Sequence, residues 1–294
     1  MYDINEKKVN QTLYLRDGRI LGFSDLGDSE GFPIFYFHGF PSSRLEALAG
    51  DEIATKNKVR LIAVDRPGIG LSDMKPQRTL LDWPDDVQEL ADALQIDKFS
   101  ALGISGGGPY LMSCAFKIPD RIITCGSVCG LGPVNSPWNI DGMSVVNRFG
   151  LTLSKNVPWA ASLFVGSLSP LMQFFPETVL NIMSGDAPEC DKIALKETEF
   201  MSIMVKAAQE AFQKGTTGLS QDLIIYGSNW GFDLSKIQVP VKIWHGEIDT
   251  VVPVIFGKYF EETIPNCKAV YFEDEGHISI VPNHFSEFIE ELVV

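Results

Sequence analysis

The sequence has little positive charge and no compositionally biased tract. Its 294 residues include 24 Lys and Arg against 38 Asp and Glu, which gives a net charge of −14. Nucleic acids are bound through basic faces, so we exclude a nucleic-acid partner and ascribe the acidity to solubility. Since 45% of the residues are hydrophobic and no repeat is visible, we expect one large domain, or a core domain with an insertion.

Cysteines are few and odd in number. The chain has five, and its first residues, MYDINEKKVN, lack the apolar stretch of an export signal. We therefore expect reduced thiols and a cytoplasmic protein. Cys125 and Cys129 could suggest a metal pair, but RIITCGSVCG is typical of a buried strand and no second Cys/His cluster lies nearby. We interpret both as core thiols and expect no metal.

One long segment lacks charge altogether. Residues 156–176, NVPWAASLFVGSLSPLMQFFP, are numerous enough to span a bilayer. The segment contains three prolines, a glycine and several polar side chains, and its flanks carry no topology signal. We expect no stable membrane insertion and predict a mobile apolar helical cover over a pocket.

Glycine is concentrated in FSALGISGGGPYLMSCAF, residues 99–116. A Walker-type phosphate loop requires Lys followed by Ser or Thr after its last glycine, but Pro109 and Tyr110 occupy those positions. A dinucleotide loop that begins at Gly106 requires a third glycine, and Leu111 takes its place. Both nucleotide-binding classes are therefore excluded.

What remains in this stretch is a Gly-x-Ser-x-Gly motif at 103–107. Such a motif presents a serine on a sharp turn between a strand and a helix, with glycines where side chains would collide. Ser105 is therefore a candidate nucleophile, which needs a base and an orienting acid.

Apolar runs recur on either side of this motif. A hairpin is predicted around Asp17 and Gly18, within TLYLRDGRILGFSDLG. The later runs are PIFYFHG, VRLIAVD, FSALGIS, IITCGSV, VKIWHG and AVYFED. Continuous apolar runs are typical of strands buried on both faces, and amphipathic helical patterns lie between them, so we predict an α/β sheet covered by helices. The alternation breaks from 131 to 237, where we find no strand and expect a helical insertion.

Four histidines are available as the base. Only His277 lies in a loop after the last predicted strand, and active groups of open parallel sheets gather at the carboxyl ends of strands. His245 also ends a strand and is the second candidate. His284 is interpreted as a surface or capping residue, and His38 precedes Gly39 at a strand end.

The acid is expected after a neighbouring strand. EIDTVVP follows VKIWHG and offers Asp249, directly before the next helix, with Glu247 as the second choice. The order Ser105, Asp249, His277 is the one expected for this type of sheet.

An oxyanion hole requires two backbone N–H donors. One is expected from Gly106, the residue after the nucleophile, and the other from Phe40 in the turn FHGFPSS.

Five ordered motifs make the chain resemble the α/β-hydrolase superfamily over nearly its whole length. They are HGFP, DRPGIGLSD, GISGGGP, HGEIDTVVP and EGHIS. The resemblance implies an eight-stranded, mostly parallel sheet with an antiparallel second strand. It also implies a helical cap at 132–232, inserted in a core formed by 1–131 and 233–294. Asp65 and Arg66 are expected to hold loops, and a serine at 105 disfavours the branches with an aspartate nucleophile.

The resemblance also implies the activity. We expect hydrolysis of a small-molecule carboxylic ester through an acyl-enzyme at Ser105, without a cofactor. Lactonase or perhydrolase activity on the same triad is an alternative. A further alternative is an aminopeptidase similar to the proline iminopeptidases, which would hold the substrate amine with cap acids. The candidate acids are Glu177, Asp186, Glu189, Glu197 and Glu199.

The cap sequence offers apolar candidates for the substrate pocket. They are Phe164, Leu171, Met172 and Phe175. Under a non-enzymatic alternative, a ligand-sensing signalling protein with a slow triad, the same four side chains would form the surface for a protein partner.

Overall fold

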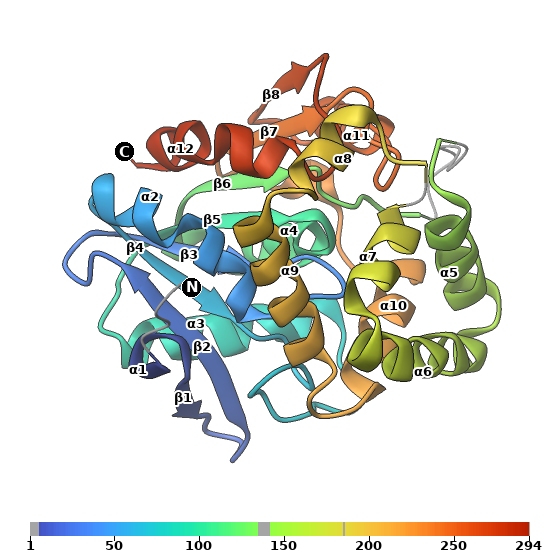
Figure 1. Ribbon diagram of the computed structural model, residues 1–294. Coiled ribbons are helices and arrows are strands. Elements are labelled where there is room, and N and C mark those ends of the chain that lie inside the picture. Colours follow the sequence, from blue (N-terminus) through green and yellow to red (C-terminus); the bar gives the residue numbers. More distant parts are fainter. Residues whose placement is uncertain (1–5, 135–141, 185, 294) are drawn as a thin grey trace.

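The computed structural model describes residues 6–134, 142–184 and 186–293 (Figure 1). Eight strands form one sheet in the order β1-β2-β4-β3-β5-β6-β7-β8. The strands are β1 Gln11–Tyr14, β2 Ile20–Gly27, β3 Phe32–Phe37, β4 Val59–Val64, β5 Phe99–Ile104, β6 Ile122–Val128, β7 Val241–Gly246 and β8 Cys267–Phe272. The α-helices are α1 Glu6–Val9, α2 Asp51–Lys56, α3 Trp83–Ala93, α4 Gly108–Lys117, α5 Val145–Asn156, α6 Pro158–Phe174, α7 Pro176–Ser184, α8 Glu189–Ala194, α9 Thr198–Ala211, α10 Thr217–Gly227, α11 Ile255–Thr263 and α12 Ile280–Leu292.

The sheet confirms the predicted topology. β2 is antiparallel to both β1 and β4, whereas the pairs from β4 through β8 are all parallel. Every apolar run predicted as a strand forms one, and the hairpin turns at Gly18, whose φ of +87° suits glycine. All six residues of β5 are buried, because the strand lies in the middle of the sheet and both faces are covered.

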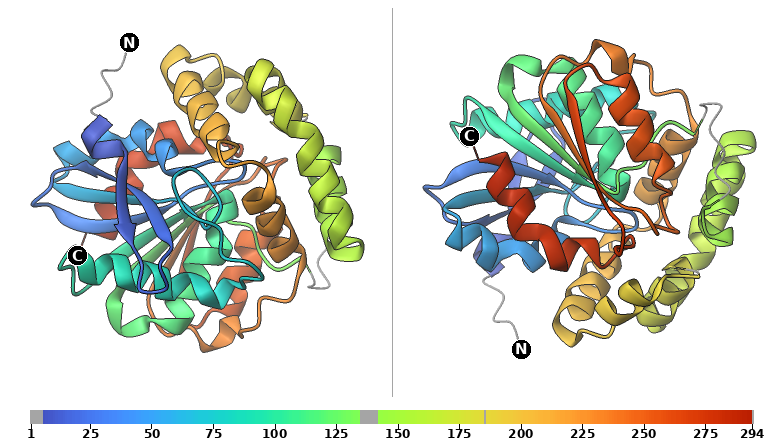
Figure 2. Two further views of the ribbon diagram at one scale, coloured as in Figure 1. Left: turned by 90° about the horizontal axis from the view of Figure 1, so that it is seen from below. Right: turned by 90° about the horizontal axis from the view of Figure 1, so that it is seen from above.

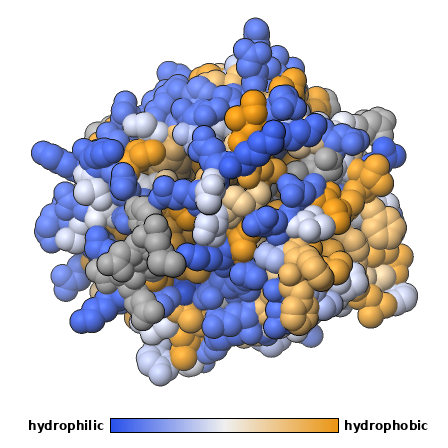
Figure 3. Space-filling view, in the orientation of Figure 1, coloured by the Kyte–Doolittle hydropathy of each residue, from blue (hydrophilic) through white to orange (hydrophobic). Residues whose placement is uncertain are grey.

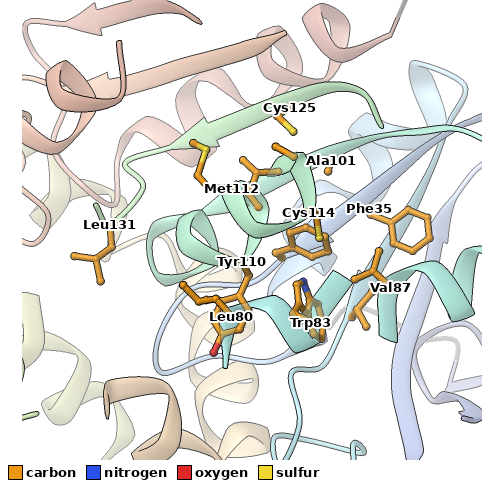
Figure 4. Packing of buried hydrophobic residues seen from close by; sticks show 14 of the residues in the cluster. Phe35, Leu80, Trp83, Val87, Ala101, Tyr110, Met112, Cys114, Cys125 and Leu131 are labelled. Atoms are coloured by element: carbon orange, nitrogen blue, oxygen red, sulfur yellow. The ribbon is translucent and has the colours of Figure 1, made fainter. Parts of the chain in front are cut away.

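Helices cover both faces of the sheet. Trp83 of α3, Tyr110 of α4 and Phe256 of α11 belong to the core cluster on one face, while Ala54 of α2 and Phe288 of α12 belong to the cluster on the other. Figure 4 shows the first cluster, where α3 and α4 pack against the strands. This two-sided core fixes the strand ends from which the candidate site is built.

The predicted helical insertion consists of α5 to α10, between β6 and β7. In Figure 2 these helices form an arc beside one end of the sheet. The described residues between Val128 and Val241 contain no strand, as the sequence predicts. Residues 135–141 and 185 of the predicted cap lie outside the described residues.

The charge-free segment forms α6 and the start of α7, with Pro170 inside α6. Within the described parts of the chain, no helix combines the length and apolar character needed to cross a bilayer. The segment nevertheless exposes large apolar side chains such as Trp159, Leu163 and Phe174. Figure 3 shows an orange, apolar area on its right side, over the insertion helices.

Candidate active site

Ser105 occupies the turn between β5 and α4. Its φ of +52° lies in the left-handed region, which a non-glycine residue adopts only when its surroundings enforce it. Those surroundings are tight, because a Cβ on Gly107 would lie 2.1 Å from the Phe37 carbonyl oxygen. A Cβ on Gly103 would lie 2.9 Å from the carbonyl oxygen of Gly107. The two flanking glycines of the motif therefore permit the turn that presents the serine at the end of β5.

His277 and Asp249 lie next to this serine. The Nε2 atom of His277 is 3.0 Å from Ser105 Oγ, and its Nδ1 atom is 2.7 Å from Asp249 Oδ2. Asp249 follows β7 and His277 follows β8, so adjacent parallel strands deliver both groups to the same edge of the sheet. The Oδ1 atom of Asp249 accepts hydrogen bonds from the N–H groups of Val251 and Val252, both at 2.8 Å, which fix the carboxylate.

The surroundings of Asp249 favour its negative charge, and those of His277 favour a positive charge on the imidazole. Burial acts to raise the pKa of Asp249, but the charge of His277 and hydrogen bonds from His245 and His277 hold that pKa well below its usual range. Burial acts to lower the pKa of His277, yet Asp249, with smaller contributions from Asp191 and Glu46, leaves it above the ordinary value of 6.5. An ionised Asp249 therefore stabilises positive charge on the imidazole.

The second candidates for base and acid lie elsewhere. His245 is fully buried, with Nε2 2.8 Å from the Val252 carbonyl and 3.5 Å from Asp249 Oδ2, so it supports the carboxylate from behind. Glu247 is exposed to solvent. His284 lies within α12 rather than at its start, and its ring packs at a tilt against Phe272, with ring centroids 4.1 Å apart.

The turn after β3, which contains Phe40, lies next to Ser105. Phe40 and Gly106 both line a cavity that also contains Ser105. The Tyr226 hydroxyl donates to the Gly106 carbonyl at 3.0 Å. The Arg66 guanidinium donates to the carbonyls of His38 and Gly39. The two peptide segments expected to supply oxyanion donors are thus held in place by other side chains.

Arg66 belongs to a buried ionic cluster that reaches into the insertion. Its Nε atom lies 2.7 Å from Asp222 Oδ2 of α10, and Asp222 also pairs with Arg78. The Tyr110 hydroxyl donates to the same carboxylate at 2.6 Å. The loop-holding role that the resemblance implies for Arg66 is therefore visible as direct contacts.

Sequence reasoning missed two buried acids beside the site. Glu46 accepts hydrogen bonds from the Gly39 N–H at 3.0 Å and the Tyr36 hydroxyl at 2.7 Å, and burial raises its pKa. Asp191 of α8 accepts from the N–H of His277 at 3.0 Å. Acidic residues in helical segments normally face solvent, and no sequence signal separates these two from their exposed neighbours.

Two cavities meet at Ser105. The larger, of about 120 Å³, is also lined by His277 and Glu46, and the smaller, of about 60 Å³, by Gly106. Apolar side chains dominate both. Those of the larger cavity include Ile104, Leu180, Met183, Phe200, Met204 and Phe285, and those of the smaller include Leu131, Met143, Leu151, Phe164 and Leu223.

Of the four predicted pocket residues, only Phe164 lines either cavity. Leu171 and Phe175 are 46% and 61% exposed, whereas Met172 is buried against Val179 and Ala208 inside the insertion. The part of the lining that the insertion contributes comes mainly from α5, α7, α9 and α10, because α6 directs much of its apolar surface to solvent. Burial of Met172 also removes it from any partner surface.

The five acids considered for amine binding are all exposed, and none lines either cavity beside Ser105. They are Glu177, Asp186, Glu189, Glu197 and Glu199.

One group of potential metal ligands occurs among the described residues: Cys129, His245 and Asp249, with ligand atoms within 4.8 Å of one another. Burial raises the pKa of the Cys129 thiol well above its ordinary value, so the thiolate that a metal requires is disfavoured. His245 already hydrogen-bonds to the Val252 carbonyl, and Asp249 to His277. The thiols of Cys125 and Cys129 are both buried, as predicted for core cysteines.

In sequence, the chain is similar to known esterases. The chain is 26% identical over 271 residues to a pimeloyl-[acyl-carrier protein] methyl ester esterase of Legionella pneumophila, which covers 88% of this chain and 93% of that protein. It is 27% identical over 282 residues to a bifunctional esterase/perhydrolase of Acinetobacter calcoaceticus, with 89% and 91% covered. An esterase structure from Exiguobacterium antarcticum superposes with a TM-score of 0.68 at 20% identity, covering 97% and 98% of the two chains. The model of the alpha/beta hydrolase fold family matches residues 33–283, and this chain belongs to that family.

Proposed function

We propose that this protein is a serine hydrolase that cleaves small-molecule carboxylic esters. The observation that carries the proposal is the hydrogen-bonded chain from Ser105 Oγ to His277 at 3.0 Å and from His277 to Asp249 at 2.7 Å. A serine hydroxyl becomes a competent nucleophile when a base accepts its proton and an acid orients that base. The esterase relatives, which match most of the chain, support the same class of reaction.

In the proposed reaction, Ser105 Oγ attacks the ester carbonyl carbon while its proton moves to His277 Nε2. The negative charge on the former carbonyl oxygen is stabilised by the N–H groups of Phe40 and Gly106, each donor contributing about 2.7–4 kcal/mol to the transition state. Collapse breaks the bond to the alcohol oxygen, which takes the proton from His277. Water then repeats these steps on the acyl-enzyme and releases the carboxylic acid.

The two cavities suggest how the ester is oriented. The leaving oxygen must lie near His277 to receive its proton, so the larger cavity takes the alcohol portion. The smaller cavity, beside Gly106, takes the acyl group. Both are predominantly apolar, which favours an uncharged ester with a short acyl chain over an amino-acyl substrate. The helical insertion acts as the cap that closes over both groups.

Labelling with a fluorophosphonate, followed by assays on p-nitrophenyl esters of graded acyl length, tests the proposal. Ser105→Ala should lose both labelling and turnover while keeping the wild-type circular dichroism spectrum. His277→Gln should lose most turnover, whereas the matched control His284→Gln should keep it. Unchanged ester turnover in Ser105→Ala would contradict the proposal. A higher rate on amino-acyl naphthylamides than on esters would favour the aminopeptidase alternative.

A further inference from the structure

Asp191 joins the helical insertion to the loop that carries His277. Its side chain is fully buried although it lies in α8, a short helix of only six residues. The Oδ2 atom accepts from the His277 N–H at 3.0 Å, and Oδ1 accepts from the N–H groups of Ile278 and Ser279, each at 2.9 Å. One carboxylate from the insertion thus satisfies three consecutive N–H groups of the core.

The core is shaped to admit this carboxylate. A Cβ on Gly276 would lie 2.4 Å from both oxygens of Asp191, so only glycine leaves room at that position. The three N–H groups directly precede α12, which begins at Ile280. The first N–H groups of a helix lack partners within it, and they form the positive end of its dipole. Ser279, the N-cap of α12, carries one of the three N–H groups, so the end of the helix favours an anion at the place that Asp191 occupies.

We propose that Asp191 is a positioning residue that couples the packing of the helical insertion on the core to the orientation of the His277 imidazole. This inference rests on the proposed function, since it assigns His277 as the base. With its backbone N–H held by Asp191 and its Nδ1 held by Asp249, His277 is fixed at two points, and Nε2 remains directed at Ser105.

The position of α8 in the chain makes this coupling sensitive to the bound ester. The helix lies between α7, which supplies Met183 to the larger cavity, and α9, which supplies Phe200 and Met204. A ligand that packs against these side chains also holds the segment between them. Occupancy of the larger cavity therefore favours the position in which Asp191 accepts the three N–H groups. His277 is then best ordered when substrate is present.

Asp191 also contributes charge at the site. The acidic groups that act on His277 are Asp249 after β7, Asp191 from α8 and Glu46 from the short 3-10 helix Arg44–Gly50, while His245 lies next to Asp249. Each of the three acids stabilises the protonated imidazole. Loss of the Asp191 charge should lower the pKa of His277 without removing any hydrogen bond of the imidazole ring itself.

The test compares Asp191→Ala, Asp191→Asn and a matched control, Glu189→Gln, which changes an exposed acid of the same helix. The assay measures kcat, KM and the pH profile with a p-nitrophenyl ester. We expect kcat to fall about 100-fold in Asp191→Ala, with KM changed far less, because misplacement of a catalytic group by about 1 Å costs that much. The acid limb of kcat/KM should move to lower pH in both Asp191 variants. Glu189→Gln should behave as wild type.

The His277 titration followed by NMR provides a readout that does not require turnover. In Asp191→Asn it should move to lower pH, and hydrogen exchange at the amides of residues 277–279 should become faster. Wild-type kcat, an unmoved acid limb and an unmoved titration in folded Asp191→Asn would overturn the inference, even if Asp191→Ala fails to fold. If the wild-type protein has no ester turnover but the His277 titration still shifts in Asp191→Asn, the proposed function is overturned and the positioning role is left intact.

Discussion

Removal of the Asp222 carboxylate should destabilise the protein strongly. Asp222 and Arg66 are 0% exposed and Arg78 is 2% exposed, so the change Asp222→Ala leaves two guanidinium groups buried without their counter-ion. Arg66 keeps its bonds to the carbonyls of His38 and Gly39, but those dipoles do not replace a full charge. Breaking a buried pair in this way costs about 3–5 kcal/mol.

That loss is a large part of the total stability, since domains unfold with a free energy of about 5–15 kcal/mol. At about 2–4 °C per kcal/mol for a large domain, the unfolding midpoint should fall by roughly 6–20 °C. Urea denaturation followed by tryptophan fluorescence and circular dichroism measures the change in the free energy of unfolding.

Asp85→Ala is the matched control. Asp85 also forms an ion pair, with Lys117 at 2.7 Å, but the two side chains are 56% and 37% exposed. An exposed pair of this kind contributes about 0–1 kcal/mol. If the unfolding free energies of the two variants agree within about 1 kcal/mol, the assignment of Asp222 as the charge that compensates both arginines is refuted.

Two further predictions concern the base and the nucleophile turn. The pKa of His277 is raised above 6.5. The base that we propose works only when neutral, so kcat/KM should fall as pH drops through a value above 6.5. An acid-limb midpoint below 6.5 in the ester assay would be inconsistent with this. Gly107→Ala should abolish activity and greatly reduce stability, because its Cβ would meet the Phe37 carbonyl at 2.1 Å. Gly166→Ala in α6, where a Cβ has no neighbour within 4 Å, should raise stability by about 0.5–1 kcal/mol, and equal melting temperatures for the two variants would contradict this.

The sheet, and the proximity of the three candidate residues Ser105, Asp249 and His277, were predictable because their signals are local. Fully apolar runs mark strands covered on both faces, and each such run forms a strand. Once the strands are placed, the direction of a parallel sheet brings Ser105, Asp249 and His277 to one edge. Asp249, which lies closer to the next helix, is buried, whereas Glu247 is exposed. This agrees with the order of preference that the sequence indicated.

The parts that could not be predicted depend on contacts between distant segments. Glu46, Asp191 and Asp222 lie in helical segments where an acid normally faces solvent. Asp191 and Asp222 are buried where the insertion packs on the core, and Glu46 is buried beside Tyr36 and Gly39 of the core. Leu171, Met172 and Phe175 lie outside the two cavities for a related reason. Because α6 is apolar on nearly every side, its sequence does not indicate that Leu171 faces solvent while Phe164 faces the cavity.

The placement of the insertion also determines the order in which the protein can be completed during synthesis. More than a hundred residues separate the end of β6 from the start of β7, which pairs with it. At a synthesis rate of about 5–20 residues per second, β6 remains an unpaired apolar edge for roughly 5 to 20 seconds. Ser105 leaves the ribosome before this interval, and Asp249 and His277 follow only after it. Chains that stop within the insertion would therefore expose a strand edge prone to aggregation and would carry Ser105 without its proposed base, His277.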